Sequence, residues 1–276
     1  MRNPNKGSGP LGSLRRAAGH PRVVPITALL LRARTVVPSA AFVAREAARR
    51  GGTFAYRLRD APHLSVLVRH GRGDAVTLGE VFHEYDYEPP AELRSIEPRR
   101  IVDLGANVGY FGAFALGRWP RATVTALEPD PENADIHARV IALNGLEDRW
   151  ELRRAAAAVR AGHLRFDASG DALSRVSEMG AVMVPAQDVL DLVAGVDLLK
   201  VDIEGGEWEI LRDPRWGHDP PSVVVLEYHP EGAAGTDPHA LALERLAAVG
   251  LTRTTTIFVR DDGYGMLWAW RPDLAE

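Results

Sequence analysis

The stretch that decides the fold is residues 102–109, VDLGANVG, followed by a helical pattern over 108–118. Its apolar start is typical of a buried strand. Gly105 allows a positive φ and has no Cβ that would block a ligand, and Gly109 lets the next helix pack close to the sheet. The helix N-terminus offers unpaired N–H groups and the positive end of a dipole. A strand, a glycine turn and a helix in this order predict a site for a nucleotide-like cofactor.

The spacing of this turn distinguishes two classes of cofactor. A dinucleotide site needs G-x-G-x-x-G, because the pyrophosphate approaches the backbone at the second glycine. Counted from Gly105, the second and third glycine positions hold Asn107 and Tyr110. Asp103 would repel a pyrophosphate but can accept hydrogen bonds from the ammonium group of an amino acid moiety. S-adenosylmethionine carries such a group, so the turn favours a methyl donor over NAD.

A carboxylate ends the next strand-like run. Glu128 closes TVTALEP at 123–129, 23 residues after Gly105. In this place it can accept hydrogen bonds from both ribose hydroxyls. NAD would use the same contact, and a simple helix-capping role before Pro129 and Asp130 is the structural alternative.

Strand and helix patterns alternate from about residue 99, which predicts a doubly wound, mostly parallel α/β sheet with ligands outside the carboxyl ends of its strands. The run at 163–169 indicates a hairpin-type insertion. The strand-like runs are 101–105, 123–129, 150–156, 197–204, 222–229, 251–259 and 265–271, and the helical patterns are 108–118, 131–144, 206–213 and 237–249.

The N-terminal part follows a different pattern. Residues 26–50 suggest two helical pieces broken at Pro38, two short strands follow at 53–60 and 64–70, and a turn with a helix lies within 73–90. We therefore predict a flexible leader (1–20), an N-terminal helical/β extension or cap (21–95) and a donor-binding domain (96–276).

Composition limits the remaining classes. The chain has 276 residues, 46% of them apolar, and no cysteine, which excludes disulfides, thiolate zinc sites and cysteine nucleophiles. Residues 1–60 carry 12 Lys and Arg against 2 Asp and Glu, and we interpret this excess as a solvated, arginine-rich face. A surface that stacks single-stranded nucleic acid is disfavoured, because no aromatic residue stands among these arginines before Phe42. The apolar run at 23–31 is too short to span a bilayer. We expect a cytoplasmic protein with no nucleic-acid partner and no stable membrane insertion.

Two further strands end in side chains that can act on an acceptor. Asp202 and Glu204 stand at i, i+2 at the end of one strand, and Glu227 and His229 end the next. An alcohol needs a base to become nucleophilic, and His229 is the natural base near neutral pH. Asp202 and Glu204 hold the acceptor hydroxyl in this interpretation, and Glu227 joins them in the alternative of a cation site. A divalent cation on these carboxylates stays open as an alternative, and no metal site is predicted.

Together these motifs resemble the FkbM-type methyltransferases, which depend on S-adenosylmethionine. The resemblance covers about 74–260 and implies a class I Rossmann-like methyltransferase fold with a seven-stranded sheet and a final antiparallel strand. It implies that Tyr85 closes over the donor, while 153–159 offers no carboxylate for the adenine. The segments that carry it are IVDLGANVGYFGAFAL (101–116), LEPDPEN (127–133), LLKVDIEGGEWEIL (198–211), VVLEYHP (224–230) and HEYDYEP (83–89).

We therefore expect an S-adenosylmethionine-dependent O-methyltransferase that acts on a hydroxyl of a small molecule, such as a sugar, a polyketide or another secondary metabolite. Transfer to nitrogen or to a carboxylate stays open, as do a non-catalytic donor-binding protein, an NAD-dependent oxidoreductase and a homodimeric assembly. The expected catalytic residues are Asp202, Glu204, Glu227 and His229, and the expected donor contacts are Tyr85, Asp103, Gly105, Ala106, Asn107, Gly109, Glu128, Pro129 and Asp202.

Overall fold

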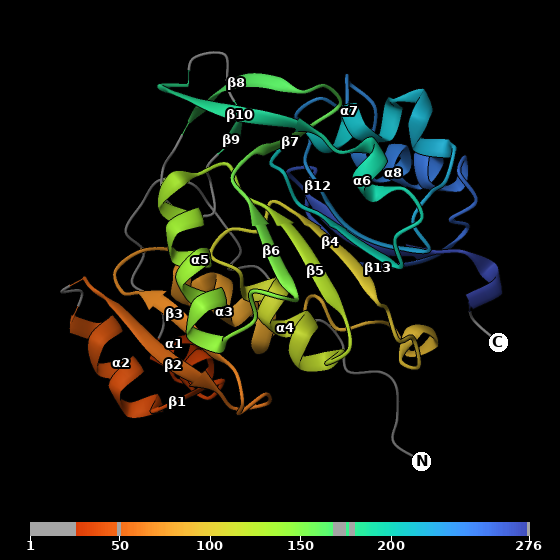
Figure 1. Ribbon diagram of the computed structural model, residues 1–276. Helices are drawn as coiled ribbons and strands as arrows, with labels where there is room; N and C mark the ends of the chain where they lie inside the picture. The colour runs from red at the N-terminus through yellow and green to blue at the C-terminus, as the bar shows by residue number, and fades with distance from the viewer. Residues whose placement is uncertain (1–25, 49–50, 168–174, 177–179, 275–276) are drawn as a thin grey trace.

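A seven-stranded sheet forms the centre of the protein in the computed structural model, which describes residues 26–48, 51–167, 175–176 and 180–274 (Figure 1). The strand order is β13-β14-β12-β11-β4-β5-β6, and β14 alone runs antiparallel to its neighbours. This arrangement confirms the predicted class I Rossmann-like methyltransferase fold. The strands are β4 (Arg100–Leu104), β5 (Thr123–Leu127), β6 (Trp150–Arg153), β11 (Leu198–Val201), β12 (Val223–Tyr228), β13 (Arg253–Val259) and β14 (Gly265–Trp270).

Helices cover both faces of this sheet, so its central strands are apolar almost throughout. Successive residues of a strand face opposite sides: Ile101 belongs to one core, Val102 to the other. The first core includes side chains of α3 (Asp74–Phe82), α4 (Tyr110–Arg118) and α5 (Pro131–Asn144). The second includes those of α6 (Leu190–Val193), α7 (Glu207–Arg212) and α8 (Pro238–Ala247).

Helix α5 shows how local sequence sets the element bounds. Asp130 caps its N-terminus by accepting hydrogen bonds from the N–H groups of Glu132 and Asn133, and Pro131 occupies the first turn. Gly145 ends it in the left-handed conformation. The prediction of a helix over 131–144 is therefore confirmed at both ends.

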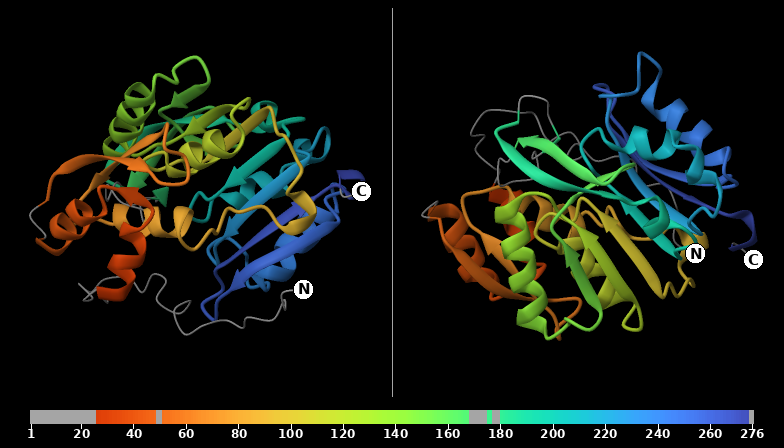
Figure 2. Two further views of the ribbon diagram at one scale, coloured as in Figure 1. Left: turned by 90° about the horizontal axis from the view of Figure 1, so that it is seen from below. Right: turned by 45° about the horizontal axis from the view of Figure 1, so that its top comes forward.

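The N-terminal segment packs onto the face of the central sheet that holds the first core. Its small antiparallel sheet has the order β1-β2-β3, and β3 lies beside α5 in Figures 1 and 2. Leu67 and Leu78 belong to the same apolar core as Ile101, so this segment shares a core with the central sheet. The boundary at residue 95 stays a prediction. The additional elements are α1 (Ile26–Ala33), β1 (Val36–Val37), α2 (Ser39–Ala48), β2 (Thr53–Leu58), β3 (Ser65–Arg69) and the 3₁₀ turns η2 (Ala91–Leu93), η3 (Pro214–Gly217) and η4 (Pro272–Leu274).

A second small sheet lies above the central one in Figure 1, in the order β7-β10-β8-β9. Its strands are β7 (Ala156–Ala158), β8 (Gly162–Asp167), β9 (Arg175–Val176) and β10 (Val182–Asp188). The predicted insertion is thus larger than one hairpin, because β10 pairs with both β7 and β8. The prediction of one strand over 150–156 was wrong, since that run is divided between β6 and β7 in two different sheets.

Among the described residues, no helix is long and apolar enough to cross a membrane. The predicted flexible leader at 1–20 lies outside the described residues.

Candidate active site

The glycine turn after β4 has the backbone that its sequence predicts. Gly105 and Gly109 have φ values of 80° and 91°, and Asn107 has a φ of 50°. The N–H groups of Gly105 and Ala106 both donate to the carbonyl of Leu127, at 3.1 and 2.9 Å, which holds the turn against the end of β5.

The reasons for glycine differ from those expected. A Cβ on Gly105 would lie 1.8 Å from the carbonyl oxygen of Asp202, so the absent side chain makes room for the protein's own backbone. A Cβ on Gly109 would lie 2.7 Å from the ring of His137 on α5. Gly109 therefore permits a close helix–helix approach. Gly105 lines the cavity at this edge of the sheet, whereas Gly109 does not, so the prediction that Gly109 contacts the donor is not supported by its place.

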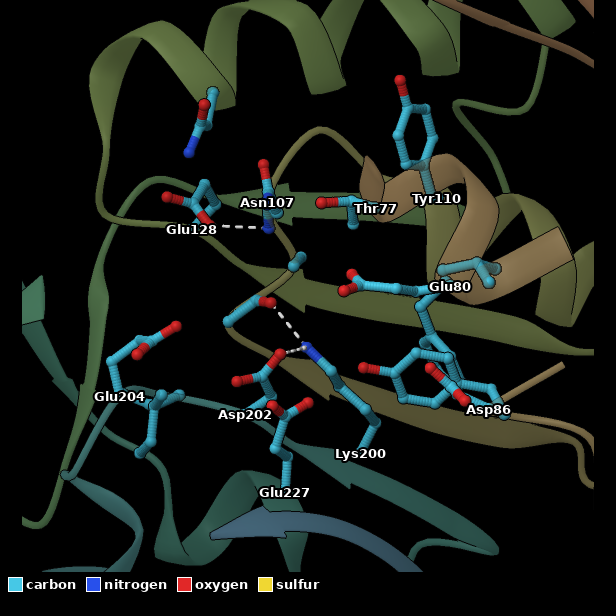
Figure 3. A pocket seen from close by; sticks show the side chains of 18 of the residues that line it. Thr77, Glu80, Asp86, Asn107, Tyr110, Glu128, Lys200, Asp202, Glu204 and Glu227 are labelled. Atoms are coloured by element: carbon cyan, nitrogen blue, oxygen red, sulfur yellow. Dashed lines mark hydrogen bonds and ion pairs between the residues drawn. The ribbon is translucent and has the colours of Figure 1, made fainter. Parts of the chain in front are cut away.

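Glu128 holds the turn and faces the cavity. Its Oε2 accepts a hydrogen bond from the N–H of Asn107 at 2.7 Å (Figure 3). Its Oε1 accepts one from the N–H of Asp130 at 2.8 Å. Asp130 caps the following helix, so the alternative of a capping role for Glu128 does not hold. Burial raises the pKa of Glu128 to about 7, although both backbone N–H groups oppose the rise. Each carboxylate oxygen has a second lone pair, so Glu128 can still accept hydrogen bonds from ribose hydroxyls.

Asp103 does not face the cavity, which corrects its predicted contact with the donor's ammonium group. It is fully buried, and its Oδ1 lies 3.3 Å from Nζ of Lys200. The two residues are direct neighbours on the adjacent parallel strands β4 and β11. Burial raises the pKa of Asp103, and the ammonium of Lys200 opposes that rise. The ammonium group that Asp103 holds is therefore the protein's own.

Lys200 was missing from the predicted site, yet it is at its centre. Its Nζ donates to the carbonyl of Gly105 at 2.5 Å and lies 3.7 Å from Oδ2 of Asp202. Burial lowers the pKa of Lys200, but the nearby carboxylates of Asp103 and Asp202 outweigh it and raise the pKa overall. One signal was present in the sequence: Lys200 is one of two lysines among 33 basic residues. A compact ammonium fits here, where a planar guanidinium would not serve three oxygens at one point.

Asp202 and Glu204 follow β11 and are not part of it, which corrects the prediction of two carboxylates on one side of a strand. The strand ends at Val201, and Glu204 has a positive φ of 53°. Both side chains still line the cavity, together with Glu227 from the end of β12. Figure 3 shows Asp202 and Glu227 close to each other beside Lys200. The parallel register of β11 and β12 explains this, because neighbouring strands end at one edge.

His229 is not a free base, which corrects its predicted role. Its ring lies between two carboxylates, with Nδ1 3.0 Å from Oε1 of Glu207 and Nε2 3.2 Å from Oε2 of Glu204. Burial alone would lower the pKa of His229, but these two contacts raise it to about 12. These contacts favour the protonated imidazole at neutral pH, and in that form it does not act as a base. Glu207, in the first turn of α7, is the fully buried partner.

Three groups approach one point as ligands of a cation would. One atom each of Asp202, Glu227 and His229 lies within 4.8 Å of the others. That the protein has no metal site stays a prediction.

Of the two tyrosines in 83–89, Tyr87 lines the cavity and Tyr85 does not. Tyr85 is 49% exposed and its hydroxyl donates to Asp60, away from the cavity. Tyr87 is buried, packs edge-on to Phe111 with ring centroids 5.2 Å apart, and lines the cavity. The positive φ of 57° at Tyr85 turns its side chain away from the site, and no sequence pattern shows such a reversal.

Eight predicted site residues line the cavity: Gly105, Ala106, Asn107, Glu128, Pro129, Asp202, Glu204 and Glu227. Four do not: Tyr85, Asp103, Gly109 and His229. Side chains from three regions complete the wall, and periodicity in the sequence could not assign them because they come from separate elements. They include Thr77, Glu80, Val81, Asp86 and Tyr87 from the N-terminal segment, Phe166 from β8, and Phe258, Arg260 and Tyr264 from the β13–β14 hairpin.

Comparison with known proteins gives two sequence matches. A family model, the methyltransferase FkbM domain, matches residues 103–247. Methyltransferase sdnD of Sordaria araneosa is 27% identical over 215 residues, which cover 63% of this chain and 82% of that protein. The matched region includes the glycine turn, Glu128, Lys200 and the carboxylates at the ends of β11 and β12.

Solved structures also match, at low identity. The FkbM methyltransferase of Methylobacillus flagellatus KT is 14% identical with a TM-score of 0.46, and the match covers 89% of this chain and 58% of that chain. An O-methyltransferase of Bacillus cereus, solved in complex with SAH, is 19% identical with a TM-score of 0.38, covering 64% of this chain and 75% of that chain. At these scores neither likeness bears on the substrate.

Proposed function

We propose that this chain, which belongs to the FkbM methyltransferase family, transfers the methyl group of S-adenosylmethionine to a hydroxyl group of a small molecule. The family model and the curated relative make it an S-adenosylmethionine-dependent methyltransferase. The hydroxyl acceptor is our proposal, and we propose a sugar, a polyketide or another secondary metabolite as its class.

The observation that carries the proposal is the pair of carboxylates beside Lys200. Asp202 and Glu227 end neighbouring parallel strands and line the same cavity as the glycine turn. A carboxylate accepts a hydrogen bond from a hydroxyl, and it can take the proton as the oxygen attacks. A carboxylate acceptor would instead meet like charges.

The cavity residues fit the methyl donor. Glu128 can accept hydrogen bonds from ribose hydroxyls, and the turn at Gly105 brings backbone to the cavity wall. When bound, the donor supplies a methyl group already activated on a sulfonium. The protein therefore needs mainly to align the acceptor oxygen with this group and to keep water out.

We assign the proton transfer to Asp202. As the acceptor oxygen forms its bond to the methyl carbon, the bond from that carbon to sulfur breaks, and the hydroxyl proton passes to the carboxylate of Asp202. Glu227 holds the same hydroxyl from the side. Lys200, 3.7 Å from Asp202, orients that carboxylate and favours its ionised form.

The test uses S-adenosylmethionine with an isotope-labelled methyl group and a panel of hydroxylated metabolites. The chemical shift of the transferred methyl group distinguishes a methyl ether from an N-methyl group or a methyl ester. An ether is expected, and Asp202→Asn should lower turnover while S-adenosylhomocysteine still binds. Glu97→Gln, in an exposed ion pair with Arg121, is the matched control. A labelled amine or ester as the product would overturn the hydroxyl assignment.

Donor binding is tested separately. S-adenosylhomocysteine at a hundredfold excess over its Kd should stabilise the fold by about 2.7 kcal/mol through linkage, whereas NAD should leave the melting temperature unchanged. The reverse pattern would refute the donor assignment. We also propose a cytoplasmic location, which the absence of cysteine supports and cell fractionation can test.

A further inference from the structure

A buried polar connection joins the N-terminal segment to the cavity wall. Arg69 ends β3, and its side chain is 9% exposed. Its Nε lies 2.9 Å from Oδ2 of Asp74, and its Nη2 lies 2.8 Å from Oδ1 of the same carboxylate. Nη2 also donates to Oδ1 of Asn133 on α5, at 2.8 Å. One guanidinium therefore joins β3, α3 and α5.

This contact determines which way the amide of Asn133 faces. A guanidinium has only donors, so the amide atom against it is the oxygen, and the NH₂ group is on the other branch of the planar amide. The main chain is held too, because the N–H of Asn133 donates to Oδ1 of Asp130 at 3.2 Å. Asn133 is 1% exposed and lines the cavity. Its orientation is thus set by a residue from outside the matched family domain, which starts at residue 103.

Asn133 is near Glu128 in the chain and in the cavity. Glu128 follows the end of β5, Pro129 comes next, and Asn133 is in the first turn of α5; all three line the cavity. An ionised carboxylate only accepts hydrogen bonds, whereas an amide NH₂ only donates them. In one cavity, the two groups together match a part of a ligand that has both hydroxyl donors and acceptor atoms. A nucleoside is such a part, since ribose hydroxyls donate while the ring oxygen and the base nitrogens accept.

The N-terminal segment is held firmly enough to position a neighbour. At the start of β3, the side-chain amide of Asn144 pairs with both backbone groups of Ser65, each at 2.8 Å. At its other end, the exposed Arg72 pairs with Glu132 at 2.6 Å, next to Asn133. Strand β3 is therefore attached to α5 at both ends of that helix, and Arg69 reaches the cavity wall from a fixed frame.

We propose that Asn133 binds the nucleoside end of the methyl donor through its NH₂ group, and that Arg69 is a positioning residue that orients this amide. The inference rests on the proposed function, since it takes S-adenosylmethionine as the donor. On this proposal the N-terminal segment both lines the cavity and helps to position a residue that binds the donor.

The first test replaces the amide and measures affinity by titration calorimetry. Asn133→Asp keeps an oxygen for Arg69 but removes the NH₂ group, and Asn133→Leu removes both polar atoms without adding charge. Each should weaken S-adenosylhomocysteine about tenfold or more. Methylthioadenosine, which has the nucleoside but no amino acid end, should lose the same factor. Asn133→Asp should keep or raise the melting temperature, because its carboxylate faces a guanidinium.

Two outcomes would overturn the inference, and a third would refute the proposed function. Wild-type affinity in both variants would remove Asn133 from the donor site. A loss for S-adenosylhomocysteine without a loss for methylthioadenosine would assign the amide to the amino acid end. Failure of the wild-type protein to bind S-adenosylhomocysteine would instead refute the proposed function, so the two failures are distinguishable.

The second test separates positioning from general stability. Arg69→Lys keeps a positive charge beside Asp74, but a lysine ammonium cannot form the two-point contact with Asp74 and reach Asn133 at the same time. It should weaken S-adenosylhomocysteine severalfold in the wild-type background and have no further effect on affinity in Asn133→Leu. Arg72→Lys, at the neighbouring exposed ion pair, is the control and should leave affinity unchanged. Equal losses from Arg69→Lys in both backgrounds would show that Arg69 acts on the fold as a whole and would refute the positioning role.

Discussion

Replacing Lys200 by methionine tests the ion pair on which the turn depends. Methionine keeps the length of the apolar stem and removes the charge. The side chains of Lys200 and Asp103 are 4% and 0% exposed, so the variant leaves the Asp103 carboxylate buried without its cation. The carbonyls of Leu104 and Gly105 also lose their N–H donor. Removing one partner of a buried pair costs about 3–5 kcal/mol. For a chain of this size that is a melting temperature lower by roughly 6–20 °C.

The second substitution shows where that cost arises. Asp103→Asn in the same chain removes the stranded charge, so the double variant should regain about 2 kcal/mol or more relative to Lys200→Met alone. Asp103→Asn by itself should cost less than Lys200→Met, because Lys200 keeps Asp202 as a partner at 3.7 Å.

Urea unfolding at neutral pH, followed by the fluorescence of the 6 tryptophans, measures these free energies. Arg121→Met is the control, since it breaks an exposed pair with Glu97 at 3.1 Å and should cost less than about 1 kcal/mol. The reasoning is refuted if Lys200→Met costs no more than Arg121→Met, or if the effects of Lys200→Met and Asp103→Asn simply add.

Three further predictions concern single groups of the site. Burial raises the pKa of Glu128 from 4.5 to about 7 on folding, so the folded state binds this proton more tightly than the unfolded state. The protein therefore loses stability as the pH rises from 4.5 to about 7. Glu128→Gln should reduce this loss, which urea unfolding at a series of pH values measures. The pKa of His229 is raised from 6.5 to about 12, so its contribution to the free energy of unfolding is complete below about pH 6.5 and is lost as the pH rises toward 12. His229→Gln should therefore lower the unfolding free energy at neutral pH, and turnover per folded molecule should fall less than in Asp202→Asn; the opposite order would restore His229 as a base. Tyr87→Phe should lower the rate of methyl transfer or the affinity for S-adenosylhomocysteine, whereas Tyr85→Phe should change neither. Turnover assays and titration calorimetry measure the two quantities. Equal losses in the two variants would contradict the assignment of Tyr87 to the cavity.

The elements of the central domain could be predicted because their signals are local. Apolar runs indicated β4, β5, β11 and β12, and the cap at Asp130 with Gly145 indicated α5. The missed elements lack such signals. Strand β10 contains Pro185 and a mixed polar pattern, and it is stable because it pairs with β7 and β8 from elsewhere in the chain.

The partners of the site side chains could not be predicted from spacing. His229 stands two positions after Glu227, which lines the cavity, yet its ring pairs with Glu204 from the end of another strand. Tyr85 and Tyr87 differ by two positions, and a local reversal of the backbone decides which one faces the site.

The amino-acid sequence by itself determined the strands of the sheet and the glycine turn and opposed a dinucleotide site, because these follow from residue periodicity and from the spacing within one turn. The tertiary structure alone decided that Asp103 is paired with Lys200, that His229 is held between two carboxylates, and that Arg69 reaches Asn133. Each of these contacts joins residues from different elements, and its length depends on strand register and helix packing. Such distances have no counterpart in the order of residues along the chain.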